Sequence, residues 1–426
     1  MKAWNKYIEE LNSGVYSDRL MDIYLDSALV PYQTKRYVDA VTKFATLFGE
    51  KEVQIYSAPG RSEVSGNHTD HQHGHVLATS INLDAIGVVA PTNDNIVHLV
   101  SGESDLIEID LSDLFVNVDE KETTNALIRG VAAGFNKSGY KLGGFEAYVT
   151  SDVLVGAGMS SSAAFESLIG TIFSGLYNDM QVSAIEIAKI GQYAENVYFG
   201  KPCGLMDQMA CSVGGLVYID FCDVNNPVVK KVPSDFEGNE YSLCIIDTKG
   251  SHADLTDDYA AIPAEMKEVA KCFGKDFLRE VDKAEFFSNI AMLRNKVSDR
   301  AVLRAIHFYK EQEHVLKAVS SLENNSFADF LEAVKNSGAS SAKNLQNIYS
   351  LKNPHAQNVT VALALSEIFL GENGVCRVHG GGFAGTIQAF VKNDAVANYK
   401  ENIENVFGKD SCHVLKVRPY GGIVAI

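Results

Sequence analysis

Hydrophobic and polar residues along the chain follow helical and strand-like periods in mixed order. Before residue 50, Tyr37, Val41 and Phe44 recur at helical spacing, which predicts a helical segment. The same spacing predicts helices over residues 125–135, 161–177, 183–199 and most of 260–370. Within the last range, residues 337–340 and the Asn-Pro pair at 353–354 are expected to interrupt the helices.

Short runs of β-branched and aromatic residues, bounded by turn residues, predict strands. These runs cover residues 53–57, 85–90, 97–100, 145–150, 216–221, 242–247, 375–379 and 386–391. The first run is expected to end at Pro59 and Gly60, and the strand-like stretch 421–426 is compatible with a return to the first domain. Helices and strands are mixed without a strict strand–helix–strand rhythm, so the pattern predicts an α+β fold with a soft boundary between residues 220 and 242.

Composition and charge narrow the class of protein. The chain has 426 residues, 46% of them apolar, and a net charge of −17. The apolar content is sufficient for a large buried core. The chain lacks the excess of basic residues that broad nucleic-acid binding needs. Neither a membrane-spanning apolar run nor a signal peptide is evident, and seven cysteines without a C-x-x-C spacing are typical of reduced thiols. We expect a cytoplasmic protein with no nucleic-acid or membrane partner.

A loop rich in glycine and serine joins a strand-like stretch to the predicted helix at residue 161. Two glycines, Gly156 and Gly158, let the backbone approach a ligand closely. Three serines, Ser160, Ser161 and Ser162, supply hydroxyls and capping oxygens at a helix start, where N–H groups bind anions. The loop matches neither a Walker A motif nor a dinucleotide fingerprint. It is either a phosphate site of another kind or a well-capped helix after a glycine turn.

A second glycine-rich loop spans residues 380–385. It matches the pattern G-x-G-x-x-G, but the residues that follow predict a strand, whereas a dinucleotide fingerprint must open a helix. A dehydrogenase is therefore rejected. Four glycines in six residues exceed what a hairpin turn needs, so we expect the backbone here to pack closely against a ligand or another loop.

Polar residues crowd the stretch 66–75, which includes four histidines. Histidines so close together cannot easily converge on one ion, so a zinc site is disfavoured. Asn67, His68 and Asp70 offer the donors and acceptors that match the hydroxyls of a carbohydrate. A polar loop without a ligand is the alternative.

Three charged residues near these loops are candidates for chemistry. Arg61 carries a guanidinium suited to phosphate, although it could equally be a surface cation. Glu195 and Asp207 flank a turn that contains glycine and proline, where a carboxylate can be a helix cap or a base. Taken singly, none of the three is decisive.

Together these segments closely resemble the galactokinase branch of the GHMP small-molecule kinases. Residues 58–71 look like the signature A-P-G-R-V-N-L-I-G-E-H-T-D-Y, and residues 156–166 look like the phosphate loop G-x-G-L-S-S-S-A-S-L-E. Residues 194–208 are similar to A-E-H…P-C-G-I-M-D-Q, and residues 380–385 to G-A-G-F-G-G. Four motifs in the family's order are a specific signal. The resemblance implies the two-domain α+β GHMP kinase fold, here with domains 1–225 and 226–426 and the active site in the cleft between them.

The resemblance implies ATP-dependent phosphorylation of a sugar at its anomeric hydroxyl, with Mg²⁺. Asp207 matches the catalytic aspartate and Arg61 the catalytic arginine. A carboxylate beside an arginine stays ionised, so Asp207 is either a weak base or the group that orients the hydroxyl. The matching positions are Gly156, Ala157, Gly158, Ser160, Ser161 and Ser162 for the phosphates, Ser162 and Glu195 for magnesium, and Asn67, His68, Asp70, Gly204 and Tyr259 for the sugar.

The departures from the family pattern gather at the sugar end. Asn67 stands where the signature has a glutamate that contacts the sugar's C6 hydroxyl, Glu63 stands where it has asparagine, and His71 replaces its tyrosine. Asn67 can still bond a hydroxyl, so D-galactose is the first expectation. Contacts of this kind decide specificity, and the absence of a negative charge at position 67 would also ease the binding of galacturonate, whose C6 group is a carboxylate. N-acetylgalactosamine is a further related sugar.

Two other interpretations are weaker. A kinase for mevalonate or homoserine belongs to the same superfamily, but residues 66–70 and 202–208 match the sugar branch. A non-catalytic sensor that binds sugar and ATP would have no need of the full set of phosphoryl-transfer residues, which this chain retains. We expect a sugar and ATP as small-molecule partners, in a monomer or weak homo-oligomer.

Overall fold

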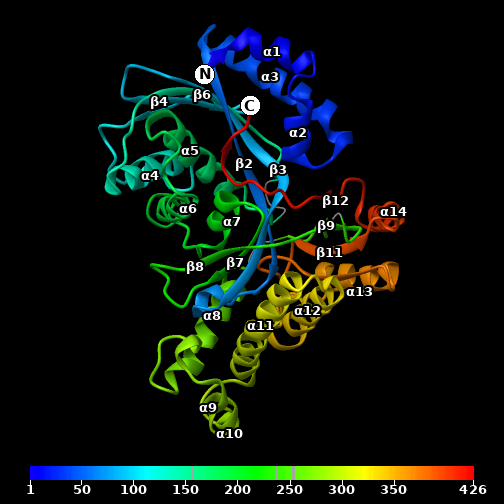
Figure 1. Ribbon diagram of the computed structural model, residues 1–426. Coiled ribbons are helices and arrows are strands. Elements are labelled where there is room, and N and C mark those ends of the chain that lie inside the picture. The colour runs from blue at the N-terminus through cyan, green and yellow to red at the C-terminus, as the bar shows by residue number, and fades with distance from the viewer. Residues whose placement is uncertain (155–157, 237, 252–254) are drawn as a thin grey trace.

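A long antiparallel ribbon of two strands, β2 (Glu52–Ser65) and β3 (His75–Pro91), runs through the middle of the computed structural model (Figure 1). The structure describes residues 1–154, 158–236, 238–251 and 255–426. Both chain termini lie at the same end of this ribbon, because β1 (Lys2–Ala3) and β13 (Ile423–Val424) both pair with β2. The strand-like end of the chain therefore does return to the first sheet.

The first sheet has the order β1-β2-β3-β6-β4-β5, with β7 paired to β3 and β8 to β7. Its pairs are antiparallel except for β4 with β6. The remaining strands are β4 (Ile96–Ser101), β5 (Ile107–Asp110), β6 (Phe145–Ser151), β7 (Leu216–Asp220) and β8 (Val228–Val232). The second sheet has the order β10-β11-β9-β12, formed by β9 (Tyr241–Asp247), β10 (Gly374–Val378), β11 (Thr386–Lys392) and β12 (Cys412–Leu415).

The predicted α+β class is confirmed by the helices that accompany these sheets. The α-helices are α1 (Trp4–Asn12), α2 (Ser17–Tyr24), α3 (Val30–Phe48), α4 (Thr124–Lys137), α5 (Ser161–Tyr177), α6 (Ala184–Tyr193), α7 (Met206–Val213), α8 (Thr256–Lys271), α9 (Lys283–Ser288), α10 (Ile290–Leu293), α11 (Asp299–Glu323), α12 (Phe327–Ser340), α13 (Asn358–Leu370) and α14 (Val396–Phe407). Short 3-10 turns are η1 (Ser27–Leu29), η2 (Asp70–Gln72), η3 (Val118–Glu120) and η5 (Leu278–Glu280), and π-helical turns are η4 (Ala194–Phe199) and η6 (Ser341–Leu345).

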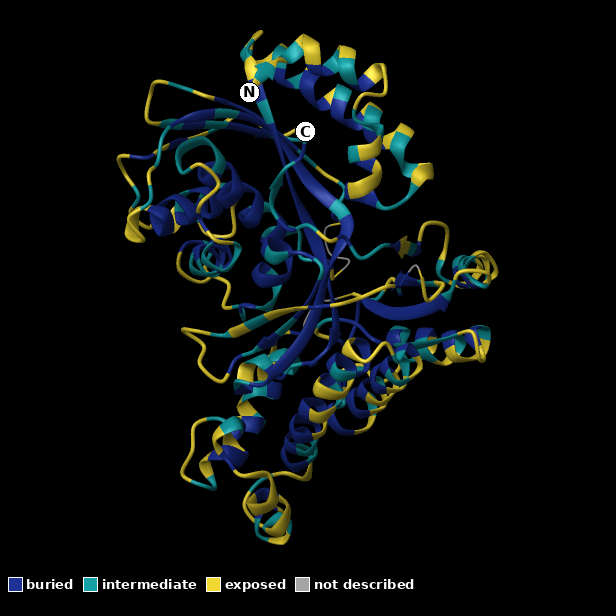
Figure 2. Ribbon diagram, viewed as in Figure 1, coloured by how far each residue is buried: buried dark blue, intermediate teal, exposed yellow. Residues whose placement is uncertain are grey.

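Helices cover both faces of the first sheet (Figure 2). Ile86 and Val88 of β3 pack against α1–α3, whereas their neighbours Ala85 and Val89 pack against α4–α6 on the opposite face. Successive residues of a strand point to opposite faces, so a strand covered on both sides reads as continuously apolar. This explains why residues 85–90 are easily predicted from the sequence.

The other half of the ribbon belongs to a different core. Val64 and Leu77 pack with residues of α11 and α12 and with the second sheet. The ribbon is therefore shared by both sheets. The chain passes from the first sheet to the second within residues 233–240, since β8 still pairs with β7. The division after residue 225 lies between these two paired strands and stays a prediction.

Several predicted element bounds are wrong, for a common reason. β2 does not end at Pro59 and Gly60 but continues to Ser65, and β3 begins at His75 rather than at residue 85. The added halves carry polar residues that are nevertheless buried, such as Ser62 and Asn82. Hydrogen bonds from distant segments satisfy these side chains, and a pattern of hydrophobicity along the chain does not reveal them.

Residues 337–340 were also predicted not to be helical, but they complete α12. Ser337 donates to the carboxylate of Glu311 at 2.5 Å, and Ser340 lies 2.9 Å from Nδ1 of His307. These small residues are helical because they face polar groups of the neighbouring helix α11. The helix predicted over 183–199 is present, but its last part is the π-helical turn η4.

The helices and the cysteines bear on two expectations from the sequence, the absence of a membrane-spanning segment and the presence of reduced thiols. None of the helices in the described part of the chain is both long enough and apolar enough to span a membrane. All seven cysteines are free thiols, as their spacing predicts.

A buried ion cluster joins the N-terminal helices, the ribbon and the C-terminal segment. Asp84 of β3 is fully buried and accepts hydrogen bonds from Tyr24 at 2.9 Å, Arg36 at 2.7 Å and Arg418 at 2.9 Å. Burial by itself raises the pKa of Asp84, but the two guanidiniums outweigh it and hold the pKa below its usual value. This cluster fixes α2 and α3 to the sheet.

We predict that Asp84→Asn lowers the free energy of unfolding by about 3–5 kcal/mol, because two buried guanidiniums lose their carboxylate. Denaturant unfolding measures this loss. The control is Asp39→Asn, whose exposed carboxylate pairs with Lys35 one helical turn away and is expected to contribute under about 0.5 kcal/mol. Equal effects of the two substitutions would contradict the role of the cluster.

Candidate active site

A cavity of about 550 Å³ opens beside the middle of the ribbon, within the size range of small-molecule sites. It gathers Arg61, Asp207 and all five residues predicted to contact a sugar. Its lining residues are Arg61, Glu63, Asn67, His68, Asp70, His71, Lys201, Cys203, Gly204, Met206, Asp207, Tyr259, Gly380 and Gly381. Segments far apart in the sequence therefore form one site.

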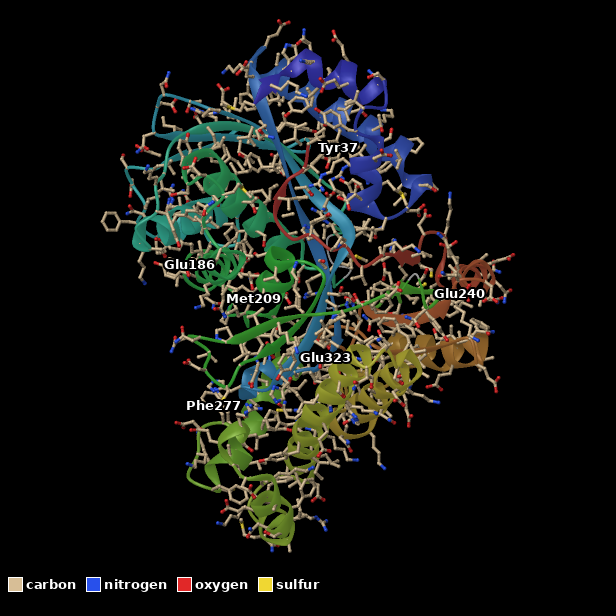
Figure 3. All side chains as sticks on the ribbon, in the orientation of Figure 1. Tyr37, Glu186, Met209, Glu240, Phe277 and Glu323 are labelled. Atoms are coloured by element: carbon tan, nitrogen blue, oxygen red, sulfur yellow. The ribbon has the colours of Figure 1, made fainter. Side chains whose placement is uncertain are left out.

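The side chains of Arg61 and Asp207 form a two-pronged ion pair in this cavity. Nε and Nη2 of Arg61 each donate to one carboxylate oxygen of Asp207 at 2.7 Å. Arg61 lies on β2 just after an irregularity in the strand register at Gly60, which redirects its side chain. Asp207 lies in the first turn of α7, two residues before Met209, which Figure 3 labels.

The surroundings of Asp207 favour its ionised form. Burial alone raises the pKa of this carboxyl, but the charge and hydrogen bonds of Arg61 and the hydroxyl of Ser160 outweigh burial and lower the pKa. The position in the first turn of a helix also favours a negative charge. Asp207 is 28% exposed, so the ionised carboxylate can still meet a ligand in the cavity.

The helix α5 begins at Ser161, as predicted, beside this ion pair. Ser160 does not cap the helix as its residue type suggests, because its backbone is left-handed at φ 53° and its hydroxyl donates to Asp207 instead. Arg61 also donates to the carbonyl of Gly158. The start of α5 and the ion pair thus form one unit, with helical N–H groups available for an anion. The predicted positions Gly156 and Ala157 lie outside the described residues.

Ser162 in the first turn of α5 meets Glu195 of η4. The hydroxyl of Ser162 donates to Oε1 of Glu195 at 3.1 Å, and Gln208 donates to Oε2 at 2.7 Å. Gln208 also donates to Glu166, whose pKa is raised well above its usual value by burial and by the nearby Glu195. A hydroxyl and a carboxylate are ligands that suit Mg²⁺. The donor set therefore fits the predicted cation.

At the other end of the cavity, Asp70 lies directly against Gly204. A Cβ atom on Gly204 would come within 2.1 Å of the Asp70 carboxylate, so a larger residue at position 204 would displace this carboxylate. One oxygen of Asp70 accepts the backbone N–H of His71 at 2.9 Å, while the carboxylate borders the cavity. Asp70 thus offers acceptor atoms to hydroxyl groups of a ligand.

The glycine-rich loop 380–385 forms a wall of the cavity and packs as closely as its composition predicts. Cβ atoms on Gly381 and Gly382 would come within 2.7 Å of the Tyr259 ring and 2.2 Å of the Asn347 carbonyl. Tyr259 donates to the carbonyl of Gly382 at 2.9 Å, and burial raises its pKa to about 12, so the hydroxyl keeps its proton. The strand β11 follows the loop, as predicted.

The histidines of residues 66–75 have separate partners. His68 lies 3.0 Å from the carbonyl of Gly381, and burial together with the nearby His71 lowers its pKa to about 4. His75 contacts Tyr218 and Arg279, and the ring of His73 stacks on Phe277. Within the described part of the chain, no cluster of histidine, cysteine and acidic residues is arranged to hold a metal ion.

Asn67 and Glu63 border the cavity, but their side chains are buried. Asn67 has no exposed surface, and its amide group donates to Glu63 at 3.0 Å and to the carbonyl of Gly380 at 2.7 Å. Burial raises the pKa of Glu63, although Arg377, whose Nη2 lies 3.0 Å away, opposes this shift. The sequence offered Glu63 only as a departure from a motif and gave no sign of its partner Arg377.

Three lining residues were not singled out from the sequence: Lys201, Cys203 and Met206. Each lies within the segment 200–208, whose motif was noted for other positions. Nζ of Lys201 lies 3.7 Å from Glu195, and the backbone N–H of Cys203 donates to Asn196 at 2.7 Å. Their place inside that motif is the signal that could have identified them.

Comparisons with known proteins agree with this geometry. Residues 125–215 match the model of the GHMP kinases N terminal domain, and residues 42–91 match the galactokinase galactose-binding signature. The chain is 30% identical to a galactokinase of Actinobacillus pleuropneumoniae serotype 3 over 375 residues, 87% of this chain and 94% of that protein. It is 29% identical to a galactokinase of Streptomyces coelicolor, over 86% of this chain and 91% of that one.

Solved structures share the fold. A Lactococcus lactis galactokinase complexed with galactose aligns with a TM-score of 0.75 and 24% identity, over 90% of this chain and 98% of that one. The Methanococcus jannaschii mevalonate kinase aligns with a TM-score of 0.59 and 13% identity, over 86% of this chain and 98% of that one. These similarities confirm the predicted GHMP kinase fold.

We predict that Arg61→Gln lowers the free energy of unfolding by about 2 kcal/mol at pH 7, between the values for exposed and buried ion pairs. In the variant, burial loses its largest opposing influence and only the hydroxyl of Ser160 and the charge of Lys201 still oppose it, so the pKa of Asp207 rises. The wild-type protein gains from ionised Asp207 above the carboxyl's unfolded pKa, whereas the variant loses stability as pH rises through that range. The difference between the two proteins should therefore grow from pH 4 to pH 7 in unfolding experiments. A constant difference in that range would contradict the assignment.

Proposed function

The chain belongs to the galactokinase family of the GHMP kinases, and we propose that it phosphorylates D-galactose at the anomeric C1 hydroxyl with ATP. The products are galactose 1-phosphate and ADP. The observation that carries this proposal is the ion pair of Arg61 and Asp207 at one cavity, between the start of α5 and the Asp70–Gly204 contact. An anion site and a group of hydroxyl acceptors thus lie on either side of a carboxylate.

In this mechanism Asp207 accepts a hydrogen bond from the C1 hydroxyl and orients its oxygen toward the transferring phosphoryl group. Its lowered pKa makes it a weak base, so orientation contributes more than proton removal before the transfer. In a loose phosphoryl-transfer transition state the bond to the nucleophile is only weakly formed, so the hydroxyl need not be deprotonated beforehand. Asp207 then takes up the proton as the new oxygen–phosphorus bond forms and the bond to ADP breaks.

Arg61 holds the carboxylate of Asp207 in place and supplies positive charge near the transferring group. Its side chain is only 8% exposed, and two hydrogen bonds to Asp207 fix the orientation of its guanidinium. The charge is therefore in position before the reaction, and the side chain need not reorganise during it. We assign the phosphates of ATP to the loop at the start of α5, with Gly158, Ser161 and Ser162 as described members. Free N–H groups at this helix start support that assignment.

For Mg²⁺ we propose Ser162 and Glu195 as protein ligands. Their oxygen atoms and the anionic carboxylate support this choice. When bound, the ion would neutralise charge on the ATP phosphates. Gln208 and Lys201 hold Glu195 in its position through contacts at 2.7 Å and 3.7 Å.

For the sugar, we propose that Asp70, the backbone at Gly204, His68 and Tyr259 provide the contacts. His68 is uncharged at neutral pH because of its low pKa, so it acts through hydrogen bonding. Asn67 was predicted as a fifth contact, but its side-chain amide is bonded to Glu63 and to the carbonyl of Gly380. We propose a cytoplasmic location, where ATP is available, and a monomer or weak homo-oligomer.

The deciding experiment measures ADP release from Mg-ATP with galactose, N-acetylgalactosamine, galacturonate, glucose and arabinose. We expect galactose to give the highest kcat/KM and phosphorus NMR to locate the new phosphate at C1. Preference for another sugar of this panel would correct the substrate but keep the reaction. Sugar binding with no ADP release from any member would overturn the kinase assignment and indicate a sensor.

We predict that Asp207→Asn lowers kcat by about 10²–10⁴-fold, the usual contribution of a group that handles a proton, with little change in sugar KM. Steady-state kinetics with galactose measures both constants. The matched control is Asp257→Asn, an exposed carboxylate of α8 that is 84% exposed and should leave kcat unchanged. A kcat within about threefold of the wild type would exclude Asp207 from catalysis.

A further inference from the structure

The side-chain amide of Asn67 has no capacity left for a ligand. Its nitrogen donates to Glu63 and to the carbonyl of Gly380 at 2.7 Å, which uses both hydrogens. Its oxygen accepts from Asn347 at 2.8 Å and from Ser341 at 3.4 Å, which uses both lone pairs. The side chain is fully buried although the residue borders the cavity.

These bonds connect the signature segment to the glycine-rich loop. Gly380 and Gly381 line the cavity, and Asn67 holds the carbonyl of Gly380. Asn347, itself bonded to Asn67, donates to the carbonyl of Gly381 at 3.2 Å. The backbone of Asn67 is held as well, because its carbonyl lies 2.9 Å from Nε2 of His307 on α11. The position of the cavity wall therefore depends on residue 67.

Glu63 completes this arrangement from the ribbon. Its carboxylate lies between the amide of Asn67 and the guanidinium of Arg377, and all three side chains are at least 95% buried. Arg377 also donates to the carbonyl of Val64 at 2.7 Å. The carboxylate that the resemblance would place at position 67 is therefore present at position 63, where it is paired with an arginine and withdrawn from the cavity.

We infer that Asn67 is a positioning residue: it holds the glycine-rich loop as the wall of the sugar cavity and makes no hydrogen bond to the sugar. This inference rests on the proposed function for the identity of the sugar. Its consequence is that discrimination between galactose and 6-deoxygalactose does not depend on residue 67. Asp70 differs from Asn67, because its carboxylate borders the cavity with acceptor capacity to spare.

The test compares kcat/KM for galactose and 6-deoxygalactose in the wild-type protein and in Asn67→Ala. We expect the sugar KM to rise about tenfold or more for both sugars in the variant, with the ratio between the sugars unchanged within about threefold. The KM for ATP should stay the same. A direct contact gives a different result: the wild type would favour galactose by about tenfold or more, and Asn67→Ala would lose that preference.

Two further variants separate positioning from general stability. Glu63→Gln leaves residue 67 intact but weakens its support, so it should raise the KM of both sugars equally. Asn82→Ala is the matched control, because Asn82 is a buried asparagine of β3 whose side chain bonds the backbone of Tyr24 and Lys416 and not the glycine-rich loop. It should lower the unfolding midpoint and leave the sugar KM unchanged. An unchanged KM in both Glu63→Gln and Asn67→Ala would overturn the inference.

Hydrogen exchange of the sugar-free protein gives a readout that does not require catalysis. Peptides that cover residues 379–385 should exchange faster in Asn67→Ala than in the wild type, and at the wild-type rate in Asn82→Ala. Unchanged exchange in Asn67→Ala would overturn the inference. If no sugar of the panel is phosphorylated, the proposed function fails, and the exchange experiment still decides whether Asn67 holds the loop.

Discussion

The two-pronged ion pair between Arg61 and Asp207 is the interaction on which the site depends. It joins β2 to the first turn of α7, and through Ser160 and the carbonyl of Gly158 it also fixes the start of α5. A partly buried charge of this kind requires its partner, because neither group is stable there alone. The same pair therefore determines where the segments meet and keeps the carboxylate ionised beside the cavity.

The ribbon of β2 and β3 makes this convergence possible. One half of it is covered by α1–α3 and α4–α6, and the other half packs against α11, α12 and the second sheet. Residues that lie just past Gly60 are therefore held by two cores at once. The buried cluster around Asp84 anchors the outer half of the ribbon to both ends of the chain. A site located between two packing units gains rigid walls from both.

Several buried polar side chains near the cavity are organised in sets that hydrogen-bond one another. Glu63, Asn67 and Arg377 form one set at the cavity, and Glu166, Gln208 and Glu195 form another beside the start of α5. Most polar atoms of these sets have a partner within the set, although Glu166 Oε1, Gln208 Oε1 and Arg377 Nε have no hydrogen-bond partner in the described part of the chain. The carboxylates of Asp70 and Asp207 differ from these sets, because they border the cavity, where a carboxylate can accept further hydrogen bonds from a ligand.

The sequence by itself determined the α+β class, most helices and the apolar strands, because amphipathic periods and turn residues are local properties of the chain. It also identified the family and the residues that converge on the cavity, because four motifs occur in a fixed order. Only the tertiary structure decided the lengths of β2 and β3, the helical state of Ser337 and the role of Ser160. The same holds for Asn67, which the motif suggested as a sugar contact and whose amide is bonded on all sides by protein. In each case the deciding hydrogen-bond partner lies far away in the sequence. Such a bond does not alter the periodic pattern of hydrophobic and polar residues, so the pattern cannot reveal it.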